Sequence, residues 1–150
     1  VLNAVSANMV NLVERVKAEG IPVLTYDHTI EGTEIDLNVD RDNKKVGRLQ
    51  MEAALDFTEG VGGNFVLVKG DPGSGVAQRI GQGYEEFASE HPEINIVADQ
   101  FHEAWSPDKA LKTVENALSA NNDDIQAIVA SADSVALGLV PAIKASNLKG

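Results

Sequence analysis

The chain has 150 residues, no cysteine, and a formal net charge of −11 that results from 23 acidic and 12 basic side chains. Its length suits one domain or pieces of two, and its 43% hydrophobic content is typical of a globular protein. The acidity argues against binding to nucleic acid or to an anionic membrane surface. The absence of cysteine excludes disulfides, zinc–thiolate sites and thiol nucleophiles.

The beginning of the chain predicts one helix and two short strands. Apolar residues recur at helical spacing over Val5–Val16, and Gly20 then ends the helix. A β-rich apolar run over 21–26 ends at Asp27–His28, and residues 35–39 alternate like a half-buried edge strand. These elements are too few for a core of their own, so we expect segments outside the 150 residues to complete both ends of the fold.

After the polar stretch Asp40–Asn43, helices and strands alternate strictly. Apolar periodicity predicts helices and strands in the order 44–58 (helix), 64–68, 76–89 (helix), 94–98, 107–120 (helix), 125–130 and 134–145 (helix). Ser106 is a good N-cap for the third of these helices, and Pro107 suits its first position. Strict alternation means parallel strands with crossover helices, and hence a doubly wound α/β sheet that is covered on both faces.

Polar residues cluster at the carboxyl ends of four predicted strands: Asp27–His28, Lys69–Ser74, Gln100–Trp105 and Ser131–Asp133. In doubly wound sheets these ends line one crevice, and ligands bind there. We therefore expect the four clusters to share one binding site. Trp105 is the only tryptophan of the chain, and its loop is the most informative of the four.

The glycine-rich loop Gly70–Gly75 fits neither common phosphate-binding pattern. It has the glycine spacing of a P-loop, but Val76 and Ala77 occupy the places of the lysine and the hydroxyl residue. Gln78 occupies the place of the third glycine in a dinucleotide-binding loop. The loop is therefore interpreted as a strand-to-helix turn without a phosphate.

Metal and hydrolase chemistry find equally little support. The three histidines, at positions 28, 91 and 102, are scattered and lack the spacing of metal ligands. Ser74 and Ser131 lack the Gly-x-Ser-x-Gly elbow of serine hydrolases, and no base is evident beside either. We expect a protein with no metal, no cofactor and no catalytic residues.

Six segments share their pattern with a known family: Val13–Asp27, Asp42–Gly47, Asp99–Gln100, Trp105–Leu111, Glu115–Asn122 and Ile128–Asp133. Through them the chain resembles the type I periplasmic binding proteins, and most closely the xylose-binding branch that serves ABC sugar importers. The resemblance covers essentially all 150 residues. It implies two similar α/β lobes, with residues 1–42 in the N-terminal lobe, residues 43–150 forming most of the C-terminal lobe, and a hinge at Asp42 and Asn43.

The resemblance also implies roles for individual residues in a closed sugar site. Asp27 would hydrogen-bond sugar hydroxyls from the first lobe, and Trp105 would stack on the sugar ring from the second. His28, Asp133 and the loop that contains Ser74 would add polar contacts.

At four positions the chain departs from the xylose binders. His28 stands where they have arginine, Ser74 and Val76 stand where they have aspartate and asparagine, and Ala132 stands where they have asparagine. Each departure removes hydrogen-bonding groups, and an unpaired buried hydroxyl costs about 1–3 kcal/mol. The expected ligand is therefore a pentose or hexose that need not be xylose.

The resemblance implies an extracytoplasmic receptor, in the periplasm or lipid-anchored at the outer face of the membrane, that passes its sugar to a permease. One alternative is a sugar-sensing subunit for a membrane signalling protein. Another is the effector domain of a sugar-responsive transcription regulator, which would require a helix-turn-helix ahead of Val1. A doubly wound enzyme is the least supported reading, because neither the glycine loop nor the serines suggest catalysis.

Overall fold

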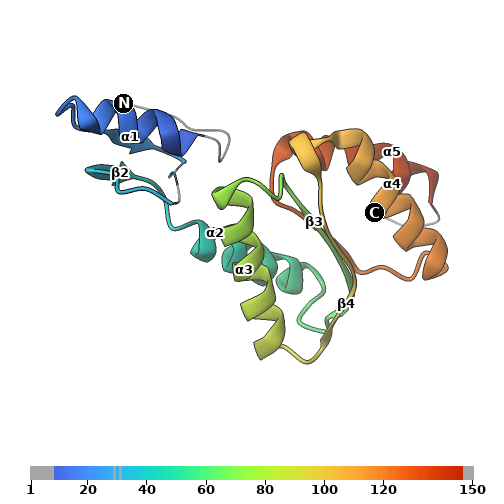
Figure 1. Ribbon diagram of the computed structural model, residues 1–150. Coiled ribbons are helices and arrows are strands. Elements are labelled where there is room, and N and C mark those ends of the chain that lie inside the picture. Colours follow the sequence, from blue (N-terminus) through green and yellow to red (C-terminus); the bar gives the residue numbers. More distant parts are fainter. Residues whose placement is uncertain (1–8, 29, 31, 147–150) are drawn as a thin grey trace.

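The computed structural model describes residues 9–28, 30 and 32–146, and it contains two separate parallel sheets (Figure 1). The smaller sheet pairs β1 with β2, and the larger one has the strand order β4-β3-β5. The elements are, in order, α1 (Val10–Ala18), β1 (Leu24–Tyr26), β2 (Leu37–Val39), α2 (Asn43–Phe57), β3 (Gly63–Lys69), α3 (Gly75–Glu90), β4 (Ile94–Phe101), η2 (Glu103–Trp105), α4 (Pro107–Ala120), β5 (Ala127–Ala130) and α5 (Asp133–Ala145). The predicted α/β class with parallel strands is confirmed.

The smaller sheet packs against α1 through one of its faces. Val13 is fully buried, and it forms a small apolar cluster with Val23 and Ile30. Gly20 ends the helix as predicted, with a φ of +75°, and its N–H donates to the carbonyl of Lys17 at 2.9 Å. The part of the predicted helix before Met9 lies outside the described residues.

Both strands of the smaller sheet are shorter than predicted, because a side chain takes part in the backbone pairing. The carboxylate of Asp36 accepts a hydrogen bond from the N–H of Val23 at 2.7 Å, so regular pairing begins only at Leu24 and Leu37. The edge strand predicted at 35–39 is present as β2, but the expected half-burial is wrong. All three residues of β2 are exposed, and the apolar cluster with α1 includes Ile35, which lies ahead of the strand.

The larger sheet is covered on both faces, as the alternation predicted. Its central strand β3 is almost entirely buried, and its side chains alternate between two cores. Phe65 and Leu67 face α2 and α3, whereas Val66 and Val68 face α4 and α5. Figure 1 shows the two helix pairs on opposite sides of this sheet, and the segment before α2 joins it to the smaller sheet.

Strand β4 runs three residues beyond its predicted end at Ala98. A register shift between Phe65 and Val66 of β3 leaves Val97 as an extra residue on β4, and pairing then continues to Phe101. Gln100 therefore belongs to the strand and not to the Trp105 loop. Among the described residues, none of the helices combines the length and apolar character needed to cross a membrane.

Candidate functional site

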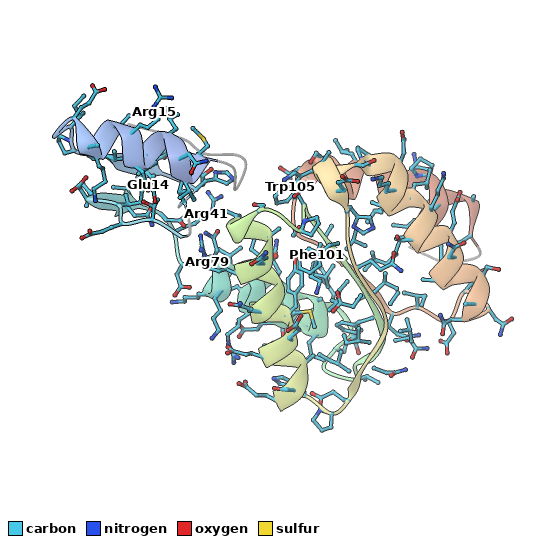
Figure 2. The ribbon with its side chains drawn as sticks, in the orientation of Figure 1. Glu14, Arg15, Arg41, Arg79, Phe101 and Trp105 are labelled. Carbon is cyan, nitrogen blue, oxygen red and sulfur yellow. The ribbon has the colours of Figure 1, made fainter. Side chains whose placement is uncertain are left out.

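A cavity of about 550 Å³ lies at the carboxyl ends of the strands. His28 and Arg41 line it from the side of the smaller sheet, while the first turns of α2 and α3, Trp105, and the turn from β5 into α5 line it from the other side. Figure 2 shows Trp105 on the rim of the larger unit that faces the segment carrying Arg41. The volume falls within the range of roughly 300–1,000 Å³ that small-molecule sites occupy.

Three of the four strand-end clusters meet at this cavity. They contribute His28, Trp105 and the turn Ser131–Asp133. The fourth cluster, Lys69–Ser74, contributes no lining residue, and only Val76 from the following helix reaches the cavity. The structure thus assembles most of the predicted site, but it leaves out Ser74 and Asp27.

Trp105 occupies a short turn that the backbone holds in an unusual conformation. Ala104 and Trp105 have φ values of 55° and 53°, and each such non-glycine residue costs about 1 kcal/mol or more. The N–H of Trp105 donates to the carbonyl of His102 at 2.9 Å, and the N–H of Ala104 donates to the carboxylate of Asp71. Asp71 thereby ties the Trp105 turn to the glycine-rich loop.

The indole of Trp105 lies directly against the backbone of Gly70. A Cβ atom at Gly70 would overlap three ring atoms of the indole, so only glycine permits this contact. The ring is half-buried, packs beside the α4–α5 core and lines the cavity. Trp105 therefore presents a fixed aromatic surface to whatever the cavity holds.

The ring of His102 supports this turn through contacts of both its nitrogens. Its ring is buried, with Nδ1 at 2.8 Å from the carbonyl of Lys69 and Nε2 at 2.9 Å from Oγ1 of Thr113. Because a carbonyl only accepts hydrogen bonds, Nδ1 must carry a proton. No cluster of three or more potential metal ligands exists among the described residues.

Asp27 lines a second, smaller cavity of about 220 Å³ instead of the large one. Its Oδ1 forms an ion pair with Nη2 of Arg41 at 2.8 Å. Nδ1 of His28 lies 3.2 Å from Oδ2 of Asp27, and this buried nitrogen makes no hydrogen bond to any of the described residues. The carboxylate that the resemblance assigns to sugar hydroxyls thus faces an arginine.

Ser74 and Asp133 have different surroundings. Ser74 is buried as the N-cap of α3, and its Oγ accepts from the N–H of Ala77 at 3.4 Å. Asp133 lines the large cavity from the first turn of α5. Ser131 lies beside it in the lining, and its buried Oγ has no hydrogen-bond partner in the described part of the chain.

The predicted hinge residues lie in the segment between β2 and α2. Asp42 is the N-cap of α2, and its carboxylate accepts from the N–H of Lys45 at 3.0 Å. Asn43 is buried, donates to the carboxylate of Asp40 at 3.0 Å and accepts from Nε of Arg41 at 3.1 Å. This segment connects the two sheets through a network of side-chain bonds.

Sequence reasoning missed three polar lining residues: Arg41, Gln50 and Ser134. Gln50 is held by the hydroxyl of Tyr84 at 2.7 Å, and burial raises the pKa of that tyrosine. The position of Gln50 within α2 gave no indication in the sequence that it lines a cavity. Arg41 could have been found, because it adjoins the predicted hinge residues Asp42 and Asn43.

The periplasmic binding protein domain family matches residues 1–150 of the chain. The D-xylose-binding periplasmic proteins of Escherichia coli (strain K12) and Haemophilus influenzae are 40% and 36% identical over 143 residues, which is 93% of the chain and 43% and 42% of theirs. The ribose import binding protein of Bacillus subtilis is 31% identical over 90% of the chain and 43% of its own length. The chain therefore spans less than half the length of these relatives.

Solved structures of solute-binding proteins are also similar to this chain, and it again covers less than half of each. An ABC transporter solute binding protein from Mycobacterium smegmatis with bound glycerol matches with a TM-score of 0.82 and 29% identity, over 95% of the chain and 49% of that protein. The fructose binding periplasmic domain of a hybrid two component system matches with a TM-score of 0.83 and 28% identity, over 93% of the chain and 45% of that protein.

Proposed function

Because the chain belongs to the periplasmic binding protein domain family, we propose that it forms the ligand-binding part of a monosaccharide receptor for an ABC importer. Relatives that are named as periplasmic proteins support a location outside the cytoplasm. A receptor of this kind binds sugar without transforming it, so no catalytic residue or cofactor is required.

The observation that carries the proposal is the cavity beside Trp105. A sugar has an apolar C–H face and a polar rim, and the half-buried indole offers a surface for the former. His28, Gln50 and Ser131 offer polar groups for the latter. The cavity thus has the two chemical characters that a monosaccharide needs.

We further propose that the two sheets belong to two lobes. Residues 1–42 would be part of the N-terminal lobe, residues 43–150 most of the C-terminal lobe, and Asp42 and Asn43 the hinge between them. A ligand that contacts both sides of the cavity would favour a closed arrangement that a membrane permease recognises.

We propose that the sugar is a pentose. Relatives are named for xylose and ribose, both pentoses. Ala132 and Val76, which line the cavity, offer no side-chain hydrogen bond. We therefore favour a xylose-like pentose that is recognised by fewer direct hydrogen bonds than in the xylose binders.

Isothermal titration of the full-length protein with D-xylose, D-ribose and D-glucose tests the proposal. We expect at least one pentose to bind, and Trp105→Ala to weaken its affinity about tenfold or more, equivalent to about 1.4 kcal/mol. Phe57→Ala is the matched control, because Phe57 is 91% exposed and does not line the cavity. Absence of binding by all three sugars, or equal affinities for both variants, would contradict the proposal.

A second candidate is a receptor that reports sugar to a signalling partner instead of a permease. The similar fructose binding periplasmic domain of a hybrid two component system favours this option. Both candidates use the same cavity, and they differ only in the protein that detects closure. Co-purification of the full-length protein with an ABC permease rather than a histidine kinase would distinguish them.

A further inference from the structure

Arg41 lies where the two cavities meet. Among the described residues that line them, Arg41 alone lines both the cavity of about 550 Å³ and the one of about 220 Å³. Asp27, which the sequence suggested as the first-lobe sugar contact, lines only the smaller one. A ligand in the larger cavity would therefore meet Arg41 before it meets Asp27.

The guanidinium of Arg41 is held in place by two contacts, and some of its N–H donors remain without a partner among the described residues. Its Nε donates to Oδ1 of Asn43 at 3.1 Å, and its Nη2 pairs with Oδ1 of Asp27 at 2.8 Å. A guanidinium has five N–H donors, and these bonds use two of them. The side chain is 57% exposed, so the remaining donors are accessible from the cavities.

Two other residues that line the larger cavity carry buried polar atoms without a hydrogen bond to the described residues. Nδ1 of His28, which has only an ion-pair contact of 3.2 Å with Asp27, and Oγ of Ser131 make no hydrogen bond to the described residues, and an unsatisfied buried polar atom costs about 1–3 kcal/mol. Such atoms mark positions where a polar ligand would restore the missing bonds. They lie on opposite sides of the cavity: His28 precedes segment 40–43, and Ser131 follows β5.

The charges around Arg41 favour a neutral ligand. Asp27 offsets the charge of Arg41 directly, and Asp133 adds a second carboxylate to the lining of the larger cavity. A sugar acid would place its carboxylate near both of these anions. A neutral polyhydroxylated ligand instead offers oxygen lone pairs to Arg41 and hydroxyl hydrogens to Asp133.

We propose that Arg41 is a specificity-determining residue that donates hydrogen bonds to an oxygen of a neutral sugar, with Asp27 positioning its guanidinium. This inference rests on the proposed function of the cavity. Arg41 would supply, from a different place in the chain, the guanidinium donors that are lost where His28 stands in place of an arginine.

Titration of the full-length protein with the best-bound neutral sugar tests this role. We expect Arg41→Ala to weaken binding about tenfold or more, and Arg41→Lys to weaken it less, because lysine keeps the charge but loses the planar donor fork. Arg15→Ala is the matched control, since Arg15 is exposed on α1 and lines neither cavity. Thermal unfolding of each variant checks that the fold is intact.

The positioning role of Asp27 needs a separate readout. We expect Asp27→Asn to weaken binding in the wild-type background but to have little further effect when combined with Arg41→Ala, because its contribution passes through the guanidinium. Additive losses from the two changes would show that Asp27 acts independently of Arg41.

The remaining outcomes separate this inference from the proposed function. If Trp105→Ala loses affinity while both Arg41 variants bind like the wild type, the role of Arg41 is wrong and the sugar site stands. If D-glucuronate binds more tightly than every neutral sugar, the assignment of a neutral ligand is wrong. If the wild type binds none of the sugars, the proposed function itself fails.

Discussion

At the scale of single residues, the pair Trp105 and Gly70 determines the shape of the site. The indole lies where a side chain at position 70 would otherwise stand. Asp71, next to Gly70, accepts from the N–H of Ala104 and so holds the turn with its positive φ values. The position of the aromatic surface is therefore set by the neighbouring loop as much as by the turn that carries it.

Gly70→Ala should displace the indole and weaken sugar binding. The added Cβ would overlap the ring, so we expect an affinity loss of about tenfold and a stability loss of about 1–3 kcal/mol from overpacking. Because Trp105 is the only tryptophan, its intrinsic fluorescence reports the displacement directly.

Gly73→Ala provides the control in the same loop. The nearest atom to a Cβ there is the side-chain Oδ1 of Asp71 at 3.1 Å, and the backbone φ is not in the left-handed region. We expect nearly unchanged fluorescence and affinity for this variant. Identical behaviour of both variants would refute the role of Gly70.

At the scale of elements, α2 and α3 cross at a point where both backbones carry glycine. A Cβ at Gly47 would overlap the carbonyl of Ile80, and one at Gly83 would overlap the carbonyl of Lys44. The two helices therefore pack backbone against backbone. This close packing brings Val46 and Gln50 of α2 and Val76 and Ile80 of α3 to the same cavity.

Gly83→Ala should destabilise the protein although alanine favours helix. The propensity gain is about 1 kcal/mol, but the Cβ meets backbone atoms that cannot rotate away. We expect a net loss of roughly 1–3 kcal/mol in the free energy of unfolding, measured by urea denaturation.

Gly81→Ala is the graded comparison on the same helix. Its Cβ would lie 2.8 Å from Cδ of Lys69, which belongs to a side chain that can adjust. The loss should therefore be smaller than for Gly83. A stability gain in Gly83→Ala would mean that the helices can separate without cost.

At the scale of the whole molecule, the segment 40–43 links the two sheets through Asp40. Its carboxylate accepts from the N–H of Arg41 at 2.8 Å, from Nδ2 of Asn43 at 3.0 Å and from Nη2 of Arg79 in α3 at 3.1 Å. Arg41 in turn pairs with Asp27 beside β1. Figure 2 shows Arg41 and Arg79 close together at this junction. Segment 40–43 is thus anchored to α3 through Asp40 and to the end of β1 through Arg41.

Asp40→Asn should loosen this junction. The change keeps the shape but removes the charge that faces Arg79 and one acceptor oxygen, at a cost of about 1–3 kcal/mol. We expect faster amide hydrogen exchange over residues 41–45 in the full-length protein. Asp42→Asn is the control, because asparagine is an equally good N-cap. Equal exchange in both variants would rule out an anchoring role for Asp40.

Local patterns predicted much of the fold, because each one depends on neighbours within a few residues. The alternation after Asp40–Asn43 implied parallel strands, Ser106 and Gly20 marked helix ends, and Trp105 was placed at the end of a strand. These features are confirmed. The hinge at Asp42 and Asn43 and the sugar contacts stay predictions.

Only the tertiary structure decided which side chains face the cavity. Asp27 pairs with Arg41, fourteen positions later, and Gln50 meets Tyr84 across two helices. Such partners depend on how distant segments pack, and helix or strand periodicity carries no information about them. The same holds for the indole against Gly70, which depends on two strands ending side by side. The sequence by itself determined the α/β fold and predicted a ligand site at the carboxyl ends of the strands, and the packing determined which side chains line the cavity there.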